Sequence, residues 1–163
     1  GATTAPVNEA GAILAATREL VRRMRPELPV ISATFRPWPI EPIDGRRVFF
    51  ATTCRSGTLP ALVRHLEAEH GCTVTGASTN LSNRALLRAD IEAAQGTFYL
   101  FLTELKAAAI DVVAEVGDSL GVPTVLCDNV PVAIDGADLP AAIFHVASDA
   151  AGRALSRKEG AHG

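Results

Sequence analysis

The sequence of 163 residues contains no apolar run of the roughly 18 to 20 residues that a membrane-spanning helix needs. It also lacks, at its start, the charged segment followed by an apolar stretch that is typical of a signal peptide. Gly1-Ala2-Thr3-Thr4 carries no methionine, and we expect the chain to be a piece of something longer. These absences predict a protein without a membrane partner, for which the cytoplasm is the default compartment.

Positive charge is not in surplus. The chain has 15 Lys and Arg residues against 18 Asp and Glu residues, which gives a formal net charge of −3. Proteins that bind nucleic acid normally present a clearly basic face to the phosphate backbone. The balance therefore argues against a nucleic-acid partner, whereas 48% hydrophobic and 20% charged residues are typical of a globular domain.

Residues with the spacing of a metal site are also scarce. Cys54, Cys72 and Cys127 stand far apart without any CxxC pair, and we interpret them as reduced thiols. His65 and His70 are five residues apart on one predicted helix, which misses the spacing of three or four that places two ligands on one face. We predict no metal site.

The first third of the chain predicts one helix and one strand. Residues 8–25 form an amphipathic helix that Pro26 ends. A short strand is expected over 30–34, and the proline-rich stretch 35–42 is expected to be an extended crossing segment. We place a boundary at 43–46. The stripe of the helix consists of Ile13, Leu14, Thr17, Leu20, Val21 and Met24.

After residue 46 the chain repeats an order of buried strand, helix, glycine and strand. Gly71, Gly96 and Gly121 stand where a helix needs a left-handed residue to end it. Apolar strands separated by helices predict an α/β fold with a mostly parallel, Rossmann-like sheet that carries helices on both faces. The expected strands are 48–53, 72–77, 98–103 and 124–128, and the expected helices are 57–70, 83–95, 106–120 and 139–156.

Three cations cluster at predicted helix starts. Lys106 follows a strand directly, Arg84 follows the expected cap Ser82, and Arg55 precedes the helix that opens near Gly57. The positive end of the helix dipole disfavours a cation there, so we expect an anion beside them. Helix starts lie at the carboxyl edge of such a sheet, where ligands bind. The strands should end at that edge with Thr53, Ala77, Thr103 and Asp128.

Several motifs, in order, resemble a known family. They are Phe35-Arg36-Pro37-x-Pro39-x-Glu41-Pro42, Val48-Phe49-Phe50-Ala51-Thr52-Thr53, His70-Gly71-Cys72, Asn80-Leu81-Ser82-Asn83-Arg84, Thr103-Glu104-Leu105-Lys106-Ala107-Ala108-Ala109 and Cys127-Asp128-Asn129-Val130-Pro131-Val132. Together, over residues 1–135, they resemble the C-terminal part of cyclic 2,3-diphosphoglycerate synthetase. Members of that family are P-loop proteins that use ATP to close 2,3-diphosphoglycerate into its cyclic anhydride.

The resemblance implies a division of the chain. Residues 1–45 would be the terminal helix and strand of a P-loop NTPase core plus the proline-rich connector. Residues 46–157 would be the Rossmann-like C-terminal α/β domain, and 158–163 a tail. In this reading the sheet is preceded by a helix-strand remnant of the nucleotide-binding core.

The sequence departs from the family at two places. No G-x-x-x-x-G-K-[ST] motif occurs, so the loop that would hold the ATP phosphates is absent from this chain. The usual Thr-Thr-Ala-Pro is Thr52-Thr53-Cys54-Arg55 here, which leaves the role of that loop open. The resemblance therefore implies that ATP and Mg²⁺ belong to the full-length enzyme and that this chain alone binds neither and is inactive. It would need the P-loop half in cis or in trans.

The resemblance and the helix starts give a set of candidate site residues. Because several phosphates meet in such a reaction, catalysis depends mainly on positioning and neutralisation of charge. We assign catalytic roles to Lys106 and Glu104. Substrate binding is assigned to Arg84, Asn83, Arg36, Thr103 and Asp128, with no metal ligand among the candidates.

Structural roles remain open for the same residues. Lys106 could pair with Glu104 or Asp128, Arg36 could fasten the proline-rich segment to the sheet, and Asn83 could be a helix cap.

Two functions stay open at this point. The chain is either the substrate-side portion of an ATP-dependent enzyme that cyclises 2,3-diphosphoglycerate, or a non-catalytic α/β module that binds a small phosphorylated acid or serves assembly. A homodimer is open as well. An exposed apolar face on the helix at 8–25 would favour the first function, because that helix would have lost its parent sheet.

Overall fold

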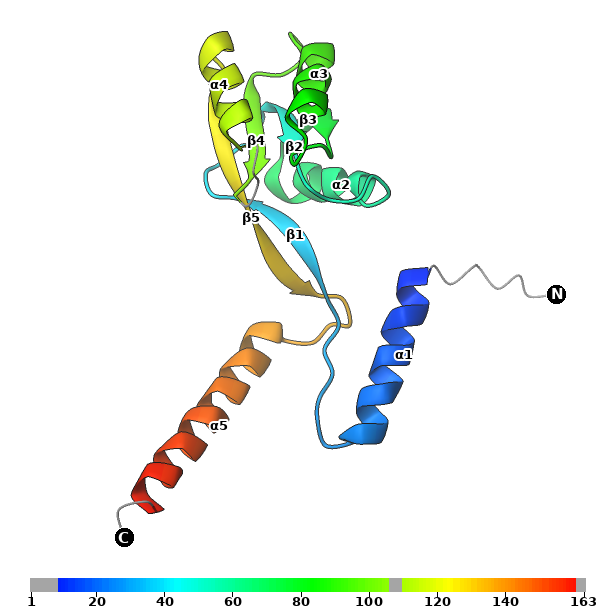
Figure 1. Cartoon of the computed structure of the whole chain (residues 1–163), viewed down its shortest axis with the longest axis vertical. Coiled ribbons are helices and arrows are strands. Elements are labelled where there is room, and N and C mark those ends of the chain that lie inside the picture. Colours follow the sequence, from blue (N-terminus) through cyan, green and yellow to red (C-terminus); the bar gives the residue numbers. More distant parts are fainter. Residues whose placement is uncertain (1–8, 106–109, 161–163) are drawn as a thin grey trace, which may run out of the picture. The chain divides into compact units, whose positions relative to one another are not determined.

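A computed structural model describes residues 9–105 and 110–160 (Figure 1). The chain forms two compact units, one made of the residues up to 34 together with those from 132 onward, and one made of residues 35–131. The elements in chain order are α1 (Glu9–Met24), β1 (Ala33–Pro39), β2 (Arg47–Ala51), α2 (Leu59–His70), β3 (Thr73–Ser78), α3 (Arg84–Ala94), β4 (Leu100–Glu104), α4 (Ile110–Leu120), β5 (Thr124–Ala133) and α5 (Leu139–Gly160).

The sheet has the order β1-β5-β4-β2-β3, and its four strands from β2 onward are parallel to their neighbours. Ala51 pairs with Ser78 on one side and with Thr103 on the other, and Glu104 pairs with Cys127. The carboxyl ends of these strands therefore meet at one edge, as the alternation of strands and helices predicts.

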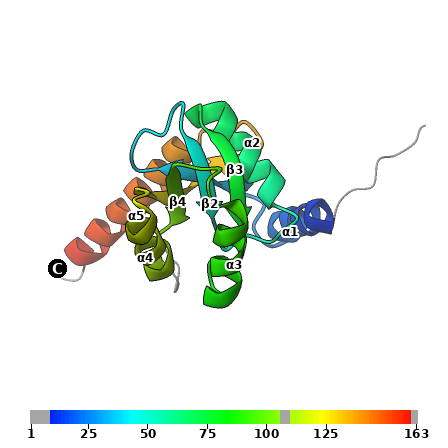
Figure 2. The ribbon, with the colours of Figure 1, turned by 90° about the horizontal axis from the view of Figure 1, so that it is seen from above.

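Helices cover both faces of this parallel part, because its strands are apolar on both sides. Val48 and Phe50 pack in one core cluster with Leu62 and Leu66 of α2. Phe49 and Ala51 face the other way into a second cluster; its helix residues are Leu87 and Ile91 of α3 and Val112 and Val113 of α4. Figure 2 shows α2 on one side of the strands and α3 and α4 on the other.

The first strand differs from the prediction. β1 runs through the proline-rich segment that we expected to be a crossing segment, and it begins later than the predicted strand at 30–34. Its pairing with β5 is antiparallel: the carbonyl of Ser32 accepts from the Ile134 amide, and the Ile40 amide donates to the Leu126 carbonyl. The sheet is therefore mixed.

Position and register explain why the prolines are tolerated. β1 is an edge strand, and β5 is its one neighbour in the sheet. In an antiparallel pair, only every second residue directs its backbone N–H and C=O groups toward the neighbouring strand. The bonded residues Ser32 and Ile40 are even-numbered, which directs the backbone nitrogens of Pro37 and Pro39 away from the ladder.

Most other element boundaries fall within a few residues of the prediction. The α2 helix starts at Leu59 rather than near Gly57, and β5 continues to Ala133, beyond the expected end at 128. The N-cap of α3 is Asn83 and not Ser82, since the Asn83 side chain accepts a hydrogen bond from the Leu86 amide. The three predicted glycines do adopt positive φ, at 63°, 81° and 64° for Gly71, Gly96 and Gly121.

The last helix is longer than expected. α5 runs to Gly160, whereas the sequence indicated a helix over 139–156 and a tail from 158. Over the described ranges, no helix is both long and apolar enough to cross a membrane.

Candidate functional site at the carboxyl edge of the sheet

The order of the strands creates a switch point between β2 and β4. The chain passes from β2 through α2 to β3 on one side, and then crosses back through α3 to β4 on the other side of β2. In open α/β sheets, ligands bind outside the carboxyl ends of the strands at such a point. The residues that follow β2 and end β4 are therefore the candidate site.

A buried carboxylate joins the two strand ends. Glu104 is 4% exposed, and its Oε1 accepts a hydrogen bond from the Thr52 hydroxyl at 2.7 Å. Its Oε2 accepts from the Thr53 amide at 2.9 Å and from the Thr53 hydroxyl at 2.8 Å. The Cys54 amide in turn donates to the Thr52 hydroxyl. Glu104 thus fixes the Thr52-Thr53-Cys54 segment, whose role the sequence left open.

Hydrogen bonding keeps this carboxylate charged. Burial alone would raise the pKa of Glu104, but the hydrogen bonds from Thr52, from Thr53 and from the Asn129 side chain outweigh it, so the pKa lies below its ordinary value. A buried ionised carboxylate with several donors is stable because the donors replace the water it has lost.

The negative charge affects two neighbouring thiols. Burial and then the charge of Glu104 raise the pKa of Cys127 to about 12. Burial raises the pKa of Cys54 as well, and Glu104 adds to it. Both cysteines are therefore uncharged and unreactive at neutral pH. This side of the edge carries negative potential, which does not favour an anion.

Backbone and side-chain bonds also fix the loop after β3. The Ser78 hydroxyl and the Asn80 side-chain amide both donate to Oδ2 of Asp90 in α3. The Leu81 amide donates to the Thr52 carbonyl, so this loop lies beside the segment that Glu104 holds. Asn83 follows as the cap of α3.

The predicted cation Arg84 forms an ion pair at the start of the helices on the second face. Its Nη1 lies 2.7 Å from Oδ2 of Asp111 in the first turn of α4, and both side chains are about half exposed. This pair lowers the pKa of Asp111. One turn further along, Arg88 and Glu115 form a similar pair at 2.9 Å.

Thr103 carries an unsatisfied hydroxyl. The residue is fully buried, and its Oγ1 has no hydrogen-bond partner among the described residues. Because side chains alternate along a strand, Thr103 lies on the face of Phe101 and of α3 and α4, whereas Glu104 lies on the opposite face.

Arg36 and Asp128 lie elsewhere. Arg36 is a half-buried residue of β1. Burial is the largest effect that lowers the pKa of His65 in α2, and the positive charge of Arg36 lowers this pKa further. The rings of His65 and His70 are 5.8 Å apart between centroids, although their spacing suggested separate faces. Asp128 is exposed, and its side chain accepts from the Asn129 amide at 2.8 Å. It lies within β5, which continues to Ala133, so the prediction that Asp128 ends its strand was wrong.

The structure thus separates the predicted site residues into groups. Glu104 belongs to the buried cluster on one face, Arg84 and Asn83 lie at the start of α3, and Arg36 lies beside α2. Lys106 lies outside the described residues.

Sequence reasoning missed Thr52, Thr53 and Asn129 as partners of Glu104. Two consecutive threonines directly after a buried strand were the available signal.

Over residues 9–105 and 110–160, no group of three or more His, Cys, Asp or Glu side chains is close enough to hold a metal ion. Glu104, the buried carboxylate at the edge, already accepts hydrogen bonds on both oxygens. We therefore derive no step through a metal or a nucleotide held by these residues.

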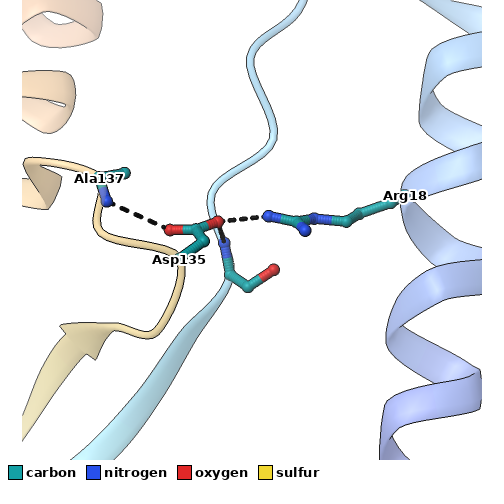
Figure 3. Close-up of polar contacts among 4 residues, drawn as sticks. Arg18, Asp135 and Ala137 are labelled. Atoms are coloured by element: carbon teal, nitrogen blue, oxygen red, sulfur yellow. Dashed lines mark hydrogen bonds and ion pairs between the residues drawn. The ribbon is translucent and has the colours of Figure 1, made fainter.

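A second polar cluster lies in the unit that contains the two terminal helices. Asp135 forms an ion pair with Arg18 of α1 and accepts hydrogen bonds from the backbone amides of Ser32 and Ala137 (Figure 3). The hydrogen bond from Ser32 lowers the pKa of Asp135 most. Burial raises this pKa by less, and the bond from Ala137 and the charge of Arg18 lower it further. This cluster fastens α1 to the turn that precedes α5.

Comparison with known proteins identifies the family. The sequence model of the "Cyclic 2,3-diphosphoglycerate synthetase C-terminal domain" matches residues 39–130, which is more than half of the chain. The match coincides closely with the unit formed by residues 35–131.

Curated relatives are similar over a longer stretch. A cyclic 2,3-diphosphoglycerate synthetase of Rubrobacter xylanophilus is 48% identical over 73% of this chain and 28% of its own length. The synthetases of Methanothermus fervidus and Methanothermobacter thermautotrophicus are each 43% identical, over 72% and 73% of this chain and 25% and 26% of their own lengths. The chain thus spans about a quarter of these relatives. It belongs to the cyclic 2,3-diphosphoglycerate synthetase family.

Proposed function

We propose that this chain is the substrate-side portion of an ATP-dependent enzyme that cyclises 2,3-diphosphoglycerate. Membership of the family over residues 39–130 is the observation that carries the proposal. In this proposal ATP and Mg²⁺ bind a nucleotide-binding portion outside this chain, which spans only about a quarter of the length of its relatives. This chain alone is inactive and binds neither of them.

The geometry favours one place for the substrate. The face of Glu104 is negative, whereas the start of α3 on the other face carries the cation Arg84. A phosphate of the substrate would compete with Asp111 for Arg84. Since exposed ion pairs contribute little, the exchange costs little. The buried Thr103 hydroxyl on the same face has no hydrogen-bond partner among the described residues, and Thr103 remains a predicted substrate residue.

The other predicted residues have supporting roles in this proposal. Glu104 holds the segment after β2 in place, and Asn83 fixes the start of α3. Lys106 lies outside the described residues and remains a predicted catalytic cation, and Asp128 and Arg36 remain predicted substrate residues. The reacting phosphates are thereby held close together and their charge is reduced, which is the main requirement of phosphoryl chemistry.

Two matched variants test the site. Arg84→Ala should weaken the binding of 2,3-diphosphoglycerate by roughly ten- to a hundred-fold, because it removes a charge-assisted hydrogen bond to phosphate. Arg88→Ala removes a similar ion pair between the same two helices one turn away, and should change the affinity by less than about twofold. Calorimetric titration of the three proteins measures both effects. Equal losses in the two variants would mean that only the pairing of α3 and α4 matters.

A chimera tests the reaction. In the Rubrobacter xylanophilus relative, the stretch that matches this chain is replaced by the whole 163-residue chain. We expect phosphorus NMR to detect cyclic 2,3-diphosphoglycerate with the chimera and ATP, and none with the isolated chain. Binding of the substrate by a chimera that forms no product would instead support the alternative, a non-catalytic module for a phosphorylated acid. Product formed by the isolated chain would contradict our placement of the nucleotide site.

A further inference from the structure

Helix α1 carries a broad apolar stripe whose side chains are mostly exposed. Ile13, Leu20 and Met24 are 61%, 58% and 70% exposed, and Leu14 at the border of the stripe is exposed as well. At about 100° per residue, these positions and Val21 lie within an arc of roughly 120°. The sequence predicted this stripe, and the structure adds that it is exposed to solvent.

The stripe also offers few polar groups to a partner. Thr17 is the polar residue near its centre, and its hydroxyl donates to the Ile13 carbonyl at 2.9 Å within the same helix. No donor on this residue is therefore left for water or a polar ligand. Uncovered apolar area of this kind is a mark of an interaction surface.

The attachment of α1 uses a different side of the helix. Arg18 lies beyond the border of the stripe and pairs with Asp135, as Figure 3 shows. The helix is thus fastened to its own chain by a polar contact and keeps its apolar side free for a partner.

The comparisons indicate what covers the stripe. The family's C-terminal domain matches residues 39–130, so α1 lies outside that domain. About three quarters of the length of the relatives lies outside the stretch that this chain matches. A helix with a stripe this broad packs on a globular core.

A second copy of the chain is a poorer partner. Stripe-to-stripe pairing would be a coiled coil, but the 16-residue helix offers little more than two heptads, whereas about three to four are needed, and Thr17 occupies one of the seam positions.

We infer that the apolar stripe of α1, defined by Ile13, Leu14, Leu20, Val21 and Met24, packs against the part of the synthetase that lies outside the region this chain matches. The inference rests on the proposed function, because it assumes that this chain works together with that part. The contact buries apolar side chains and joins the substrate-side portion to the remainder of the enzyme.

Thiol labelling of the chimera described above tests the inference directly. Leu20→Cys places a thiol on the stripe, and Ala12→Cys places one on the exposed polar side of the same helix. Peptide mass spectrometry separates both from the three natural cysteines. We expect the thiol introduced by Leu20→Cys to react quickly in the isolated chain and roughly tenfold or more slowly in the chimera, because burial limits the access of the reagent. The thiol introduced by Ala12→Cys should react quickly in both.

Two results would overturn the inference. The first is equal reactivity of the thiol introduced by Leu20→Cys in the isolated chain and the chimera. The second is protection in the isolated chain that grows with protein concentration, which would make a second copy the partner. Labelling does not depend on catalysis, so protection without cyclic product would contradict only the proposed function, and cyclic product without protection would contradict only this inference.

Discussion

At the scale of single residues, Glu104 is the most constrained side chain of the candidate site. Its carboxylate accepts hydrogen bonds from Thr52 and Thr53, which lie 52 and 51 residues away in the sequence. It thereby ties the carboxyl ends of two neighbouring strands together at the switch point. We interpret its first role as positioning, and a catalytic role stays a prediction.

The variant Glu104→Gln tests that role. The glutamine side chain would place its N–H group opposite the donors of Thr52 and Thr53. A buried donor left without an acceptor costs about 1–3 kcal/mol in the free energy of unfolding at pH 7. Urea denaturation measures the loss. Glu115→Gln is the control, because its ion pair with Arg88 is exposed and should contribute under about 1 kcal/mol.

The pH dependence of stability gives a second readout. The pKa of Glu104 is lower in the folded chain than its ordinary value of 4.5, so its stabilisation is fully present above pH 4.5 and is lost as the pH falls through the folded pKa. The free energy of unfolding of Glu104→Gln should therefore fall less steeply in this acid range than that of the wild type. Equal slopes would show that Glu104 titrates alike in both states.

Gly76 shows how tightly β3 packs. A Cβ added there would lie 2.7 Å from Cδ2 of Phe49 and 2.9 Å from Cβ of Ala94, and the register of β2 and β3 shifts at this point. We expect Gly76→Ala to destabilise the chain by about 1–3 kcal/mol, since neither neighbour has room to move. Gly57→Ala is the control, because nothing lies within 4 Å of the added atom. Thermal melts that show equal stability of both variants would contradict the packing.

At the scale of elements, the start of α3 separates the observed cap from the predicted one. Asn83 accepts a hydrogen bond from the Leu86 amide, whereas Ser82 is exposed and precedes the cap. Asn83→Ala should therefore cost about 1 kcal/mol in the free energy of unfolding, and Ser82→Ala should cost nearly nothing. Chemical denaturation of the pair distinguishes the two residues, and a larger loss for Ser82→Ala would restore the prediction from sequence.

The strands show what sequence periodicity can predict. Apolar residues throughout β2 and β4 predicted two covered faces, and the structure confirms a helix on one face and two on the other. The identity of β1 was not predictable in the same way, because its prolines suggested an irregular segment. Its partner β5 lies about 90 residues further along the chain, and no local pattern reports such a pairing.

At the scale of the whole molecule, Asp135 holds together the unit that contains α1. Its carboxylate accepts from the amides of Ser32 and Ala137 in addition to pairing with Arg18. In Asp135→Ala these amides lose their acceptor, and we expect their hydrogen exchange to quicken by roughly five- to tenfold. Exchange in the unit formed by residues 35–131 should not change.

Asp149→Ala is the matched control for that experiment. Asp149 is an exposed residue of α5, and its Oδ2 lies 3.6 Å from Nε2 of His145 in the same helix. The exchange of Ser32 and Ala137 should stay as in the wild type. Quickening by both variants would indicate a general loosening rather than the loss of one acceptor.

The sequence by itself determined the elements and the family of this protein. Alternation, helix stripes and terminal glycines are local patterns that a single segment carries, and so they predicted the mostly parallel sheet and the apolar stripe of α1. The tertiary structure alone decided the antiparallel pairing of β1, the donors around Glu104 and the separation of Glu104 from Arg84. Those features depend on which distant segments become neighbours, and hydrogen bonds between such segments leave no periodic trace in either of them.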